Sequence, residues 1–254
     1  MPNPNIAAWS RFHEEVLAAE KALGSPPTVW YRGVPDVSFK LTPSLGRFKN
    51  GLANERRLYE TYDQWTRGIA DRSDGTESRL ARRRNDWDIL FEMQHFGIPT
   101  RLLDWTEVFG IAVFFALFSG DHNGKDAAVF VLNPFRLNVK TGKDDLFGQW
   151  DMDSFSYRQV YWDGKPLRPV LPLAFNPGHD IRRLHAQRGR FTVHGFNSDP
   201  LESLAGDCVK KVVLRNSAKN GAREFLKMAG IDELSLFPDI YGAARFIKSI
   251  VGLS

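Results

Sequence analysis

The chain is poor in the residues and motifs from which compact catalytic and structural sites are often built. Its 254 residues include one cysteine, Cys208, which excludes an intramolecular disulfide framework and any cysteine-rich metal site. The longest apolar run, around residues 108–118, is too short to span a bilayer. The N-terminal residues lack the basic region followed by an apolar stretch that marks a secretory signal. The sequence therefore predicts a cytoplasmic protein with no membrane partner.

Several catalytic motifs are also absent. No phosphate-binding P-loop and no G-x-G-x-x-G after a strand occurs, so the common nucleotide-binding loops are excluded. No H-E-x-x-H, C-x-x-C or acidic-pair pattern predicts a metal, and the G-x-S-x-G elbow of a serine hydrolase is missing. A metal-dependent hydrolase or nuclease would have to draw its ligands from the acidic residues of 141–153, so no metal ligand is assigned.

The residues that are present describe an ordinary globular chain with a mild positive charge. Hydrophobic residues make up 43% and charged residues 25%, and the net charge is +4. Basic residues gather at 82–84 and within 179–194, the second group next to three histidines. Such clusters attract anions, so the stretch 179–194 is a candidate nucleic-acid contact. The alternative for 82–84 is a solvated helix face.

Hydrophobic periodicity and breakers predict a single α+β domain. A separate amphipathic helix is expected within 1–27, before the main domain at 28–254. The other predicted helices are 52–70, 79–96, 108–118, 218–229 and a closing helix with Pro238 near its start. Predicted extended segments are 28–33, 39–45, 100–105, 127–134, 189–195 and 208–214, whereas 135–180 reads as long loops with one strand near 169–174.

The stretch HFGIPTRLLDWTEVFGIAVFFALF, residues 95–118, sets polar groups at the mouth of the most apolar helix. Gln94 and His95 follow two core positions by four residues, so they continue the inward face of their helix. Asp104 and Glu107 have the spacing of a capping box and predict Asp104 as the N-cap of the apolar helix. Helix N-termini favour anions, so Arg101 is expected to face a ligand there.

Five blocks of the sequence resemble the FRG domain family, named for a Phe/Tyr-Arg-Gly motif. The most specific are WYRG at 30–33 and MQHFGIPTRLLDWTE at 93–107. The others are AVFVLNP at 128–134, AQRGRFTVHG at 186–195 and SLFPDIYGAARFI at 235–247. Because FRG domains occur in bacterial and phage-related proteins, the resemblance implies a toxin or phage-defence effector with an antitoxin or defence partner.

The order of elements also resembles the ADP-ribosyltransferase fold, whose split β-sheet core has flanking helices. In that fold the first strand carries an arginine, often within Tyr-Arg-Gly, and a later strand–helix–strand unit forms the nicotinamide pocket. The resemblance implies NAD as cofactor, and it implies transfer of ADP-ribose to a nucleic-acid or protein acceptor. It makes Arg32, His95, Asp104 and Gln187 the candidate catalytic residues. The candidate cofactor-binding residues are Tyr31, Arg32, Gly33, Gln94, Thr100, Arg101, Trp105 and His194, with Trp105 or Tyr31 stacking on nicotinamide.

The sequence departs from that family where a catalytic glutamate is expected. Residues 187–190 read Gln-Arg-Gly-Arg, and a glutamine cannot act as a base. Either Asp104, Glu55 or Glu233 supplies the carboxylate, or the domain is a non-catalytic nucleotide or nucleic-acid binding module of a defence system. Structural roles compete for several candidates: a salt bridge for Arg32, a cap for Asp104, and core positions for His95 and Trp105.

Overall fold

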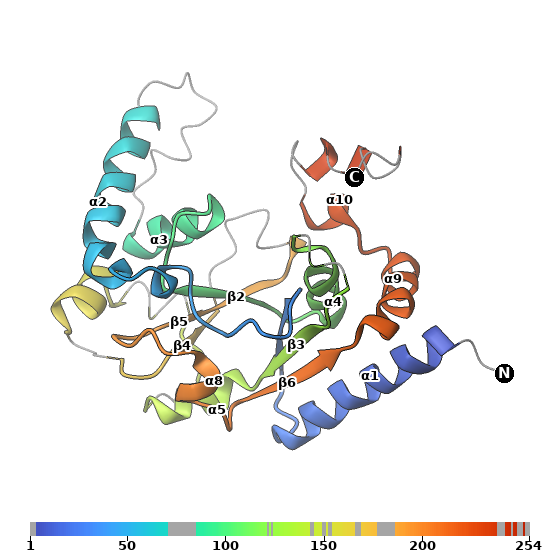
Figure 1. The fold of residues 1–254 in the computed structure, drawn as a ribbon. Coiled ribbons are helices and arrows are strands. Elements are labelled where there is room, and N and C mark those ends of the chain that lie inside the picture. Colours follow the sequence, from blue (N-terminus) through green and yellow to red (C-terminus); the bar gives the residue numbers. More distant parts are fainter. Residues whose placement is uncertain are drawn as a thin grey trace.

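The core of the protein is one open sheet of antiparallel strands in the order β4-β5-β2-β1-β3-β6 (Figure 1). The computed structural model describes the chain apart from residues 1–3, 71–84, 121, 123, 143–144, 149–150, 152–153, 166–168, 177–185, 238–241, 245, 248–250 and 252–254. The strands are β1 (Trp30–Val34), β2 (Leu102–Thr106), β3 (Ala127–Leu132), β4 (Leu173–Phe175), β5 (Gly189–Val193) and β6 (Val209–Leu214). The predicted α+β class is confirmed.

The sheet consists of two well-paired halves that meet at a narrow join. Five residue pairs link β1 to β3, and five link β2 to β5. By contrast, β1 and β2 share the single pair Tyr31↔Thr106. Beyond this pair the two central strands diverge, so side chains of β1 and β2 are free to face a space between the halves.

Helices cover one face of both halves. On the β1-β3-β6 half, α1 (Pro4–Ala22), α4 (Phe109–Phe118) and α9 (Lys219–Met228) pack in a shared apolar cluster with alternate strand residues such as Val129 and Val212. On the other half, α2 (Gly51–Ala70), α3 (Asp86–His95) and the turn η2 (Gln159–Asp163) pack against Leu102 and Phe191. Figure 1 shows these two groups on opposite sides of the join.

The opposite face of the sheet is covered by short elements. Trp30, Leu103 and Trp105 pack there with Leu137 of α5 (Pro134–Lys140) and Leu201 of α8 (Leu201–Leu204). The remaining described elements are η1 (Leu45–Arg47), η3 (Asn216–Ala218) and α10 (Glu233–Leu236). The helix α5 is capped by Asn133 and has a proline at its first position. The sequence-based prediction of long loops over 135–180, with one strand near 169–174, missed this helix.

Two local predictions are wrong. Asp104 does not cap the apolar helix, because it lies inside β2 and pairs with Phe191 of β5. The helix begins instead after Val108, whose N–H donates to the Thr106 hydroxyl at 3.1 Å. The predicted extended segment 39–45 is not a strand: the N–H of Leu41, for example, donates to the side-chain carboxylate of Glu202 on α8.

Some expectations concern parts of the chain that the structure does not describe. These are the basic run 82–84, the first half of the stretch 179–194, and the start of the closing helix at Pro238. Within the described ranges, no helix combines the length and apolar character needed to cross a membrane. In the same ranges, no three His, Cys, Asp or Glu side chains gather in the way a metal ion would require.

Candidate functional site

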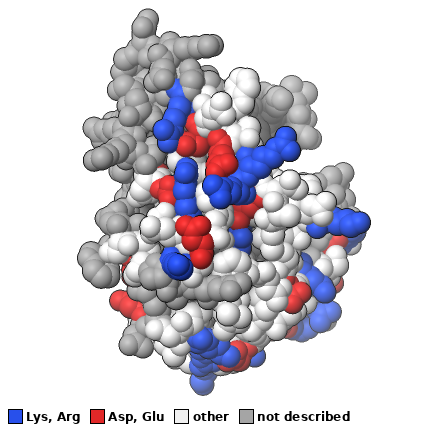
Figure 2. Space-filling model, turned by 90° about the vertical axis from the view of Figure 1, so that its left-hand side faces the viewer, with Lys and Arg blue, Asp and Glu red and all other residues white. Residues whose placement is uncertain are grey.

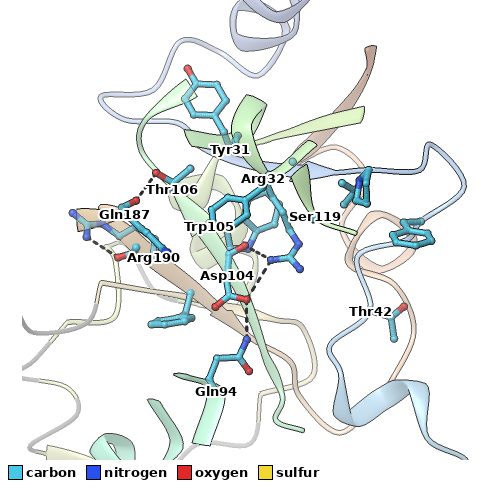
Figure 3. Close-up of a pocket in the computed structure, with 18 of the residues that line it drawn as sticks. Tyr31, Arg32, Thr42, Gln94, Asp104, Trp105, Thr106, Ser119, Gln187 and Arg190 are labelled. Atoms are coloured by element: carbon cyan, nitrogen blue, oxygen red, sulfur yellow. Dashed lines mark hydrogen bonds and ion pairs between the residues drawn. The ribbon is translucent and has the colours of Figure 1, made fainter. Parts of the chain in front are cut away.

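A cavity of about 630 Å³ lies beside the join between the two halves of the sheet. This volume lies within the roughly 300–1,000 Å³ typical of small-molecule sites. Its walls come from β1, from residues 35–47 (the β1 loop), from the C-terminal end of α3, from β2, from α4, and from the start of β5. Segments distant in sequence therefore converge on one space (Figure 3).

A chain of polar contacts links Arg32, Asp104 and Gln94 at this cavity. Nη1 of Arg32 donates to the backbone oxygen of Asp104 at 2.5 Å and lies 3.5 Å from Oδ2 of its carboxylate. Nε2 of Gln94 donates to the same carboxylate oxygen at 2.8 Å, and Oγ1 of Thr100 donates to Oε1 of Gln94 at 2.6 Å. The Asp104 side chain is nevertheless 55% exposed. The carboxylate is thus oriented by two neighbours and still accessible to a ligand (Figure 3).

The cavity walls carry an excess of positive charge. Arg32, Lys40, Arg47 and Arg190 line it, against the single carboxylate of Asp104 among the lining residues. Glu107 neutralises Arg190 through two contacts of 3.0 Å. Partial burial and the charge of Arg32 lower the pKa of Arg47, and Asp104 partly offsets this. Such a site favours an anionic ligand.

The aromatic candidates differ in where their rings lie. Trp105 lines the cavity, and its indole N–H donates to the Thr192 hydroxyl at 3.0 Å, which fixes the ring. Tyr31 also touches the cavity, but its hydroxyl donates to Glu20 of α1 at 2.6 Å, and burial raises the pKa of that hydroxyl. Figure 3 shows its hydroxyl directed away from Arg32 and Trp105. Trp105 is 3% exposed and also packs in the apolar cluster of Trp30 and Leu103, so part of its ring has the core role that competed with stacking.

Gly33 lines the cavity, and the packing of α4 explains why this position lacks a side chain. A Cβ at this position would lie 1.8 Å from the backbone oxygen of Ala112 and 2.6 Å from the nitrogen of Ala116. Both atoms belong to α4, which packs directly on β1. The glycine is thus required by helix–strand packing, and close approach of a ligand to the backbone is not needed to explain it.

Gln187 reaches the cavity at the entry to β5 but is held by its neighbours. Its carbonyl accepts from the Thr106 hydroxyl at 2.7 Å, and its side-chain amide donates to the Leu236 carbonyl at 3.2 Å. The next residue, Arg188, has a positive φ of 42°, so the turn into β5 is strained. His95 also lines the cavity, at the end of α3, as its predicted inward position requires.

Arg101 is not a ligand-facing residue, which corrects the prediction from its place in the sequence. It is 4% exposed and forms a bidentate ion pair with Glu55. Thr100 is likewise 1% exposed and reaches the site only through Gln94. Of the three carboxylates proposed to replace the missing glutamate, Asp104 lines the cavity, whereas neither Glu55 nor Glu233 is among the residues that line it.

His194 was a candidate cofactor-binding residue, and its position in the structure corrects this prediction. His194 is 2% exposed and does not line the cavity. Neither of its ring nitrogens has a hydrogen-bond partner within the described parts of the chain. Burial, with the charge of Arg101, lowers the pKa of His194 to about 3.

The family model of the FRG domain matches residues 27–125. The chain contains an FRG domain. The matched FRG domain spans β1 through α4 and includes the linked side chains of Arg32, Gln94 and Asp104, whereas Gln187 lies beyond its end. No curated protein sequence and no solved structure matches the chain.

Lys40 and Arg47, both within the FRG domain, are site residues that the sequence pattern did not identify. They lie on the β1 loop, which was assigned to an extended segment and its end. No periodicity distinguishes them from surface lysines and arginines. The only signal was indirect: a Pro- and Gly-containing basic stretch directly follows the Arg-bearing strand.

On the face shown in Figure 2, the charged side chains that the structure describes do not single out a nucleic-acid contact. On the side of the molecule where α2 lies, Figure 2 shows acidic and basic side chains interspersed. They include exposed pairs along α2, such as Arg56 with Glu60 at 2.9 Å. Of the basic stretch 179–194, Arg190 is neutralised by Glu107 and 179–185 lies outside the description. A nucleic-acid partner through this stretch therefore stays a prediction.

Proposed function

We propose that this cavity binds NAD and that the protein is an ADP-ribosyltransferase-like enzyme, modifying a nucleic-acid or protein acceptor as a toxin or phage-defence effector. One observation carries the proposal: Arg32, Asp104 and Gln94, from three separate elements, converge on a positively charged cavity of about 630 Å³. A dinucleotide needs an anion-binding region, an aromatic surface and an oriented polar group in one space. Each of these is a feature of the cavity.

The arrangement of the elements supports the same proposal. In the ADP-ribosyltransferase resemblance, the first strand carries an arginine and a strand–helix–strand unit forms the nicotinamide pocket. Here Arg32 lies on β1, and the unit β2–α4–β3 supplies Asp104, Trp105 and Phe115 to the cavity. The narrow join at Tyr31↔Thr106 supports this reading, because the resemblance implies a sheet split into two halves.

In this proposal Asp104 takes the role of the missing glutamate. The bond between C1′ of the ribose and the nicotinamide nitrogen breaks, and its electron pair leaves with nicotinamide. The ribose then carries developing positive charge, which a nearby carboxylate stabilises. The acceptor forms a new bond to C1′ and loses a proton, which Asp104 accepts. Gln94 holds the carboxylate in place through its 2.8 Å contact.

A second function, nucleotide binding without transfer, is favoured by one observation at β5. Gln187 stands where the glutamate was expected, and its amide donates to Leu236. Among the cavity-lining residues, β5 contributes no carboxylate. If Asp104 does not act on the ribose, the domain retains NAD without cleaving it.

The experiment is to incubate the purified protein with NAD and acceptor, and to measure NAD binding, nicotinamide release and labelled acceptor. Arg32→Gln and Asp104→Asn are the test variants, and Arg56→Gln, on the exposed side of α2, is the matched control. The proposal is supported if nicotinamide release is lost in both test variants and retained in the control. Binding without release favours the second function, and absence of both binding and release overturns both.

A further inference from the structure

The β1 loop, residues 35–47, is held in place at both ends. Near its start, Asp36 accepts from Nζ of Lys125 at 2.5 Å and from the Ser38 hydroxyl at 2.7 Å. Towards its end, the N–H of Leu45 donates to the Thr100 carbonyl at 3.0 Å. Because both ends are anchored, the side chains between them are presented to the cavity with little freedom to move away. Preorganisation of this kind lowers the entropic cost of binding a ligand.

Two cations on this loop lack a carboxylate partner. Within the described ranges, the side chain of Lys40 has no hydrogen-bond or ion-pair partner. Nε of Arg47 donates a hydrogen bond to the Thr42 carbonyl at 3.1 Å. That bond uses Nε and leaves both terminal nitrogens of Arg47 available. Like-charged groups around one cavity repel one another, and a bound anion relieves this repulsion.

The loop faces Arg32 from the side opposite to Asp104. In Figure 3, Arg32 lies between the carboxylate of Asp104 and the loop segment that carries Thr42. A phosphate placed beside Asp104 would be repelled by the carboxylate. A phosphate placed on the loop side of Arg32 lies towards the loop that carries Lys40 and Arg47, which both line the cavity, and Arg47 is close enough to Arg32 for the two charges to interact.

We propose that Lys40 and Arg47, together with Arg32, form the subsite for the diphosphate of the dinucleotide, with the nicotinamide ribose on the side of Asp104, Gln94 and Trp105. A diphosphate carries two negative charges, and guanidinium groups bind its oxygens in a bidentate manner. The orientation follows from charge: the anionic centre of the ligand lies against the three cations, and the cationic reacting ribose lies against the carboxylate. The identity of the rest of the ligand rests on the proposed function.

The test measures binding of inorganic pyrophosphate, NAD and nicotinamide riboside, which lacks phosphate, to the full chain. The variants are Lys40→Gln and Arg47→Gln, with Lys49→Gln as a matched control, because Lys49 is exposed just beyond the same loop and does not line the cavity. Each test variant is expected to weaken the binding of pyrophosphate and of NAD about tenfold or more, without changing the binding of nicotinamide riboside. Arg47→Lys is expected to restore part of the affinity, because it keeps the charge but not the fork of donors.

The outcomes separate this subsite from the proposed function. Pyrophosphate binding that depends on Arg47 in a protein that does not cleave NAD supports the subsite and counts against the transferase. NAD cleavage with an unchanged KM in both test variants overturns the subsite and leaves the transferase standing. Thermal unfolding of each variant checks that lost binding is not lost folding. Equal losses of affinity for pyrophosphate and for nicotinamide riboside would also overturn the subsite.

Discussion

Arg101 and Glu55 form a buried bidentate ion pair, with Nε to Oε1 at 2.5 Å and Nη2 to Oε2 at 2.6 Å. The pair joins the residue just before β2 to α2, and the hydroxyl of Tyr157 donates to Oε1 of Glu55 at 2.5 Å. Burial is the largest single effect and would lower the pKa of Arg101, but the hydrogen bond to Glu55 and the interactions with Tyr157 and Tyr161 together outweigh it, and the net shift is upward. Arg101, three residues before Asp104 in the sequence, is thus part of the structural core.

Breaking this pair is expected to destabilise the fold. Glu55→Gln leaves the Arg101 charge buried without a counter-charge, and the free energy of unfolding is expected to fall by about 3–5 kcal/mol. Urea unfolding provides the measurement. Glu60→Gln is the control, because its pair with Arg56 is exposed and such pairs contribute about 0–1 kcal/mol. Equal effects of the two substitutions would contradict the structural role assigned to Glu55.

Gly33→Ala is expected to displace α4 from β1. The added Cβ would overlap the backbone oxygen of Ala112, and backbone cannot move aside as a flexible side chain can. The expected loss of unfolding free energy is about 1–3 kcal/mol or more, together with weaker NAD binding because α4 forms a cavity wall. Gly148→Ala is the control, since a Cβ there would meet nothing within 4 Å. A fully stable Gly33→Ala variant would show that α4 packs differently.

The stability of the protein is expected to fall in acid because of His194. Its pKa is about 3 in the fold and 6.5 in the reference state. Between these values the unfolded chain binds a proton that the folded chain does not, so stability decreases as the pH falls from 6.5 towards 3. His194 changes the free energy of unfolding by at most about 1.4 kcal/mol per pH unit.

His194→Leu removes this titration and replaces two unpartnered ring nitrogens with apolar surface. Unfolding free energies measured from pH 7 to pH 4.5 should therefore fall less steeply in the variant than in the wild-type protein. The same substitution at His13, which is exposed on α1, is the control. Parallel profiles for His194→Leu and the wild type would mean that His194 does not govern this loss.

Asp104→Asn is expected to affect transfer more than binding. The amide keeps the size of the side chain and can still bond Gln94, but it neither stabilises a cationic ribose nor accepts a proton. The kcat for nicotinamide release should drop by about 100-fold or more, with a dissociation constant for NAD within about tenfold of the wild-type value. A variant that keeps full kcat would remove Asp104 from the chemistry.

Several features of the site followed from local patterns. The inward position of Gln94 and His95 came from helical spacing after Leu90 and Phe91, and both line the cavity. The strand bearing Arg32 and the apolar helix that follows β2 were predicted from composition, and the structure has them at 30–34 and 109–118. These predictions succeeded because each depends on a short-range period that neighbouring residues set together.

Other features depended on partners that are distant along the chain. Arg101 and Asp104 are three residues apart, yet the first is sealed against Glu55, 46 positions earlier, and the second opens to the cavity. The β1 loop has no periodic pattern, and its cations became part of the site only because the loop is anchored to other elements.

By itself, then, the sequence determined many of the helices and strands, and it determined that an arginine-bearing strand precedes a polar segment and a buried helix. Tertiary structure decided which of those polar residues face a ligand. The physical reason is that local periodicity depends on neighbours in the chain, whereas the burial and pairing of a charge depend on whichever distant segment packs against it.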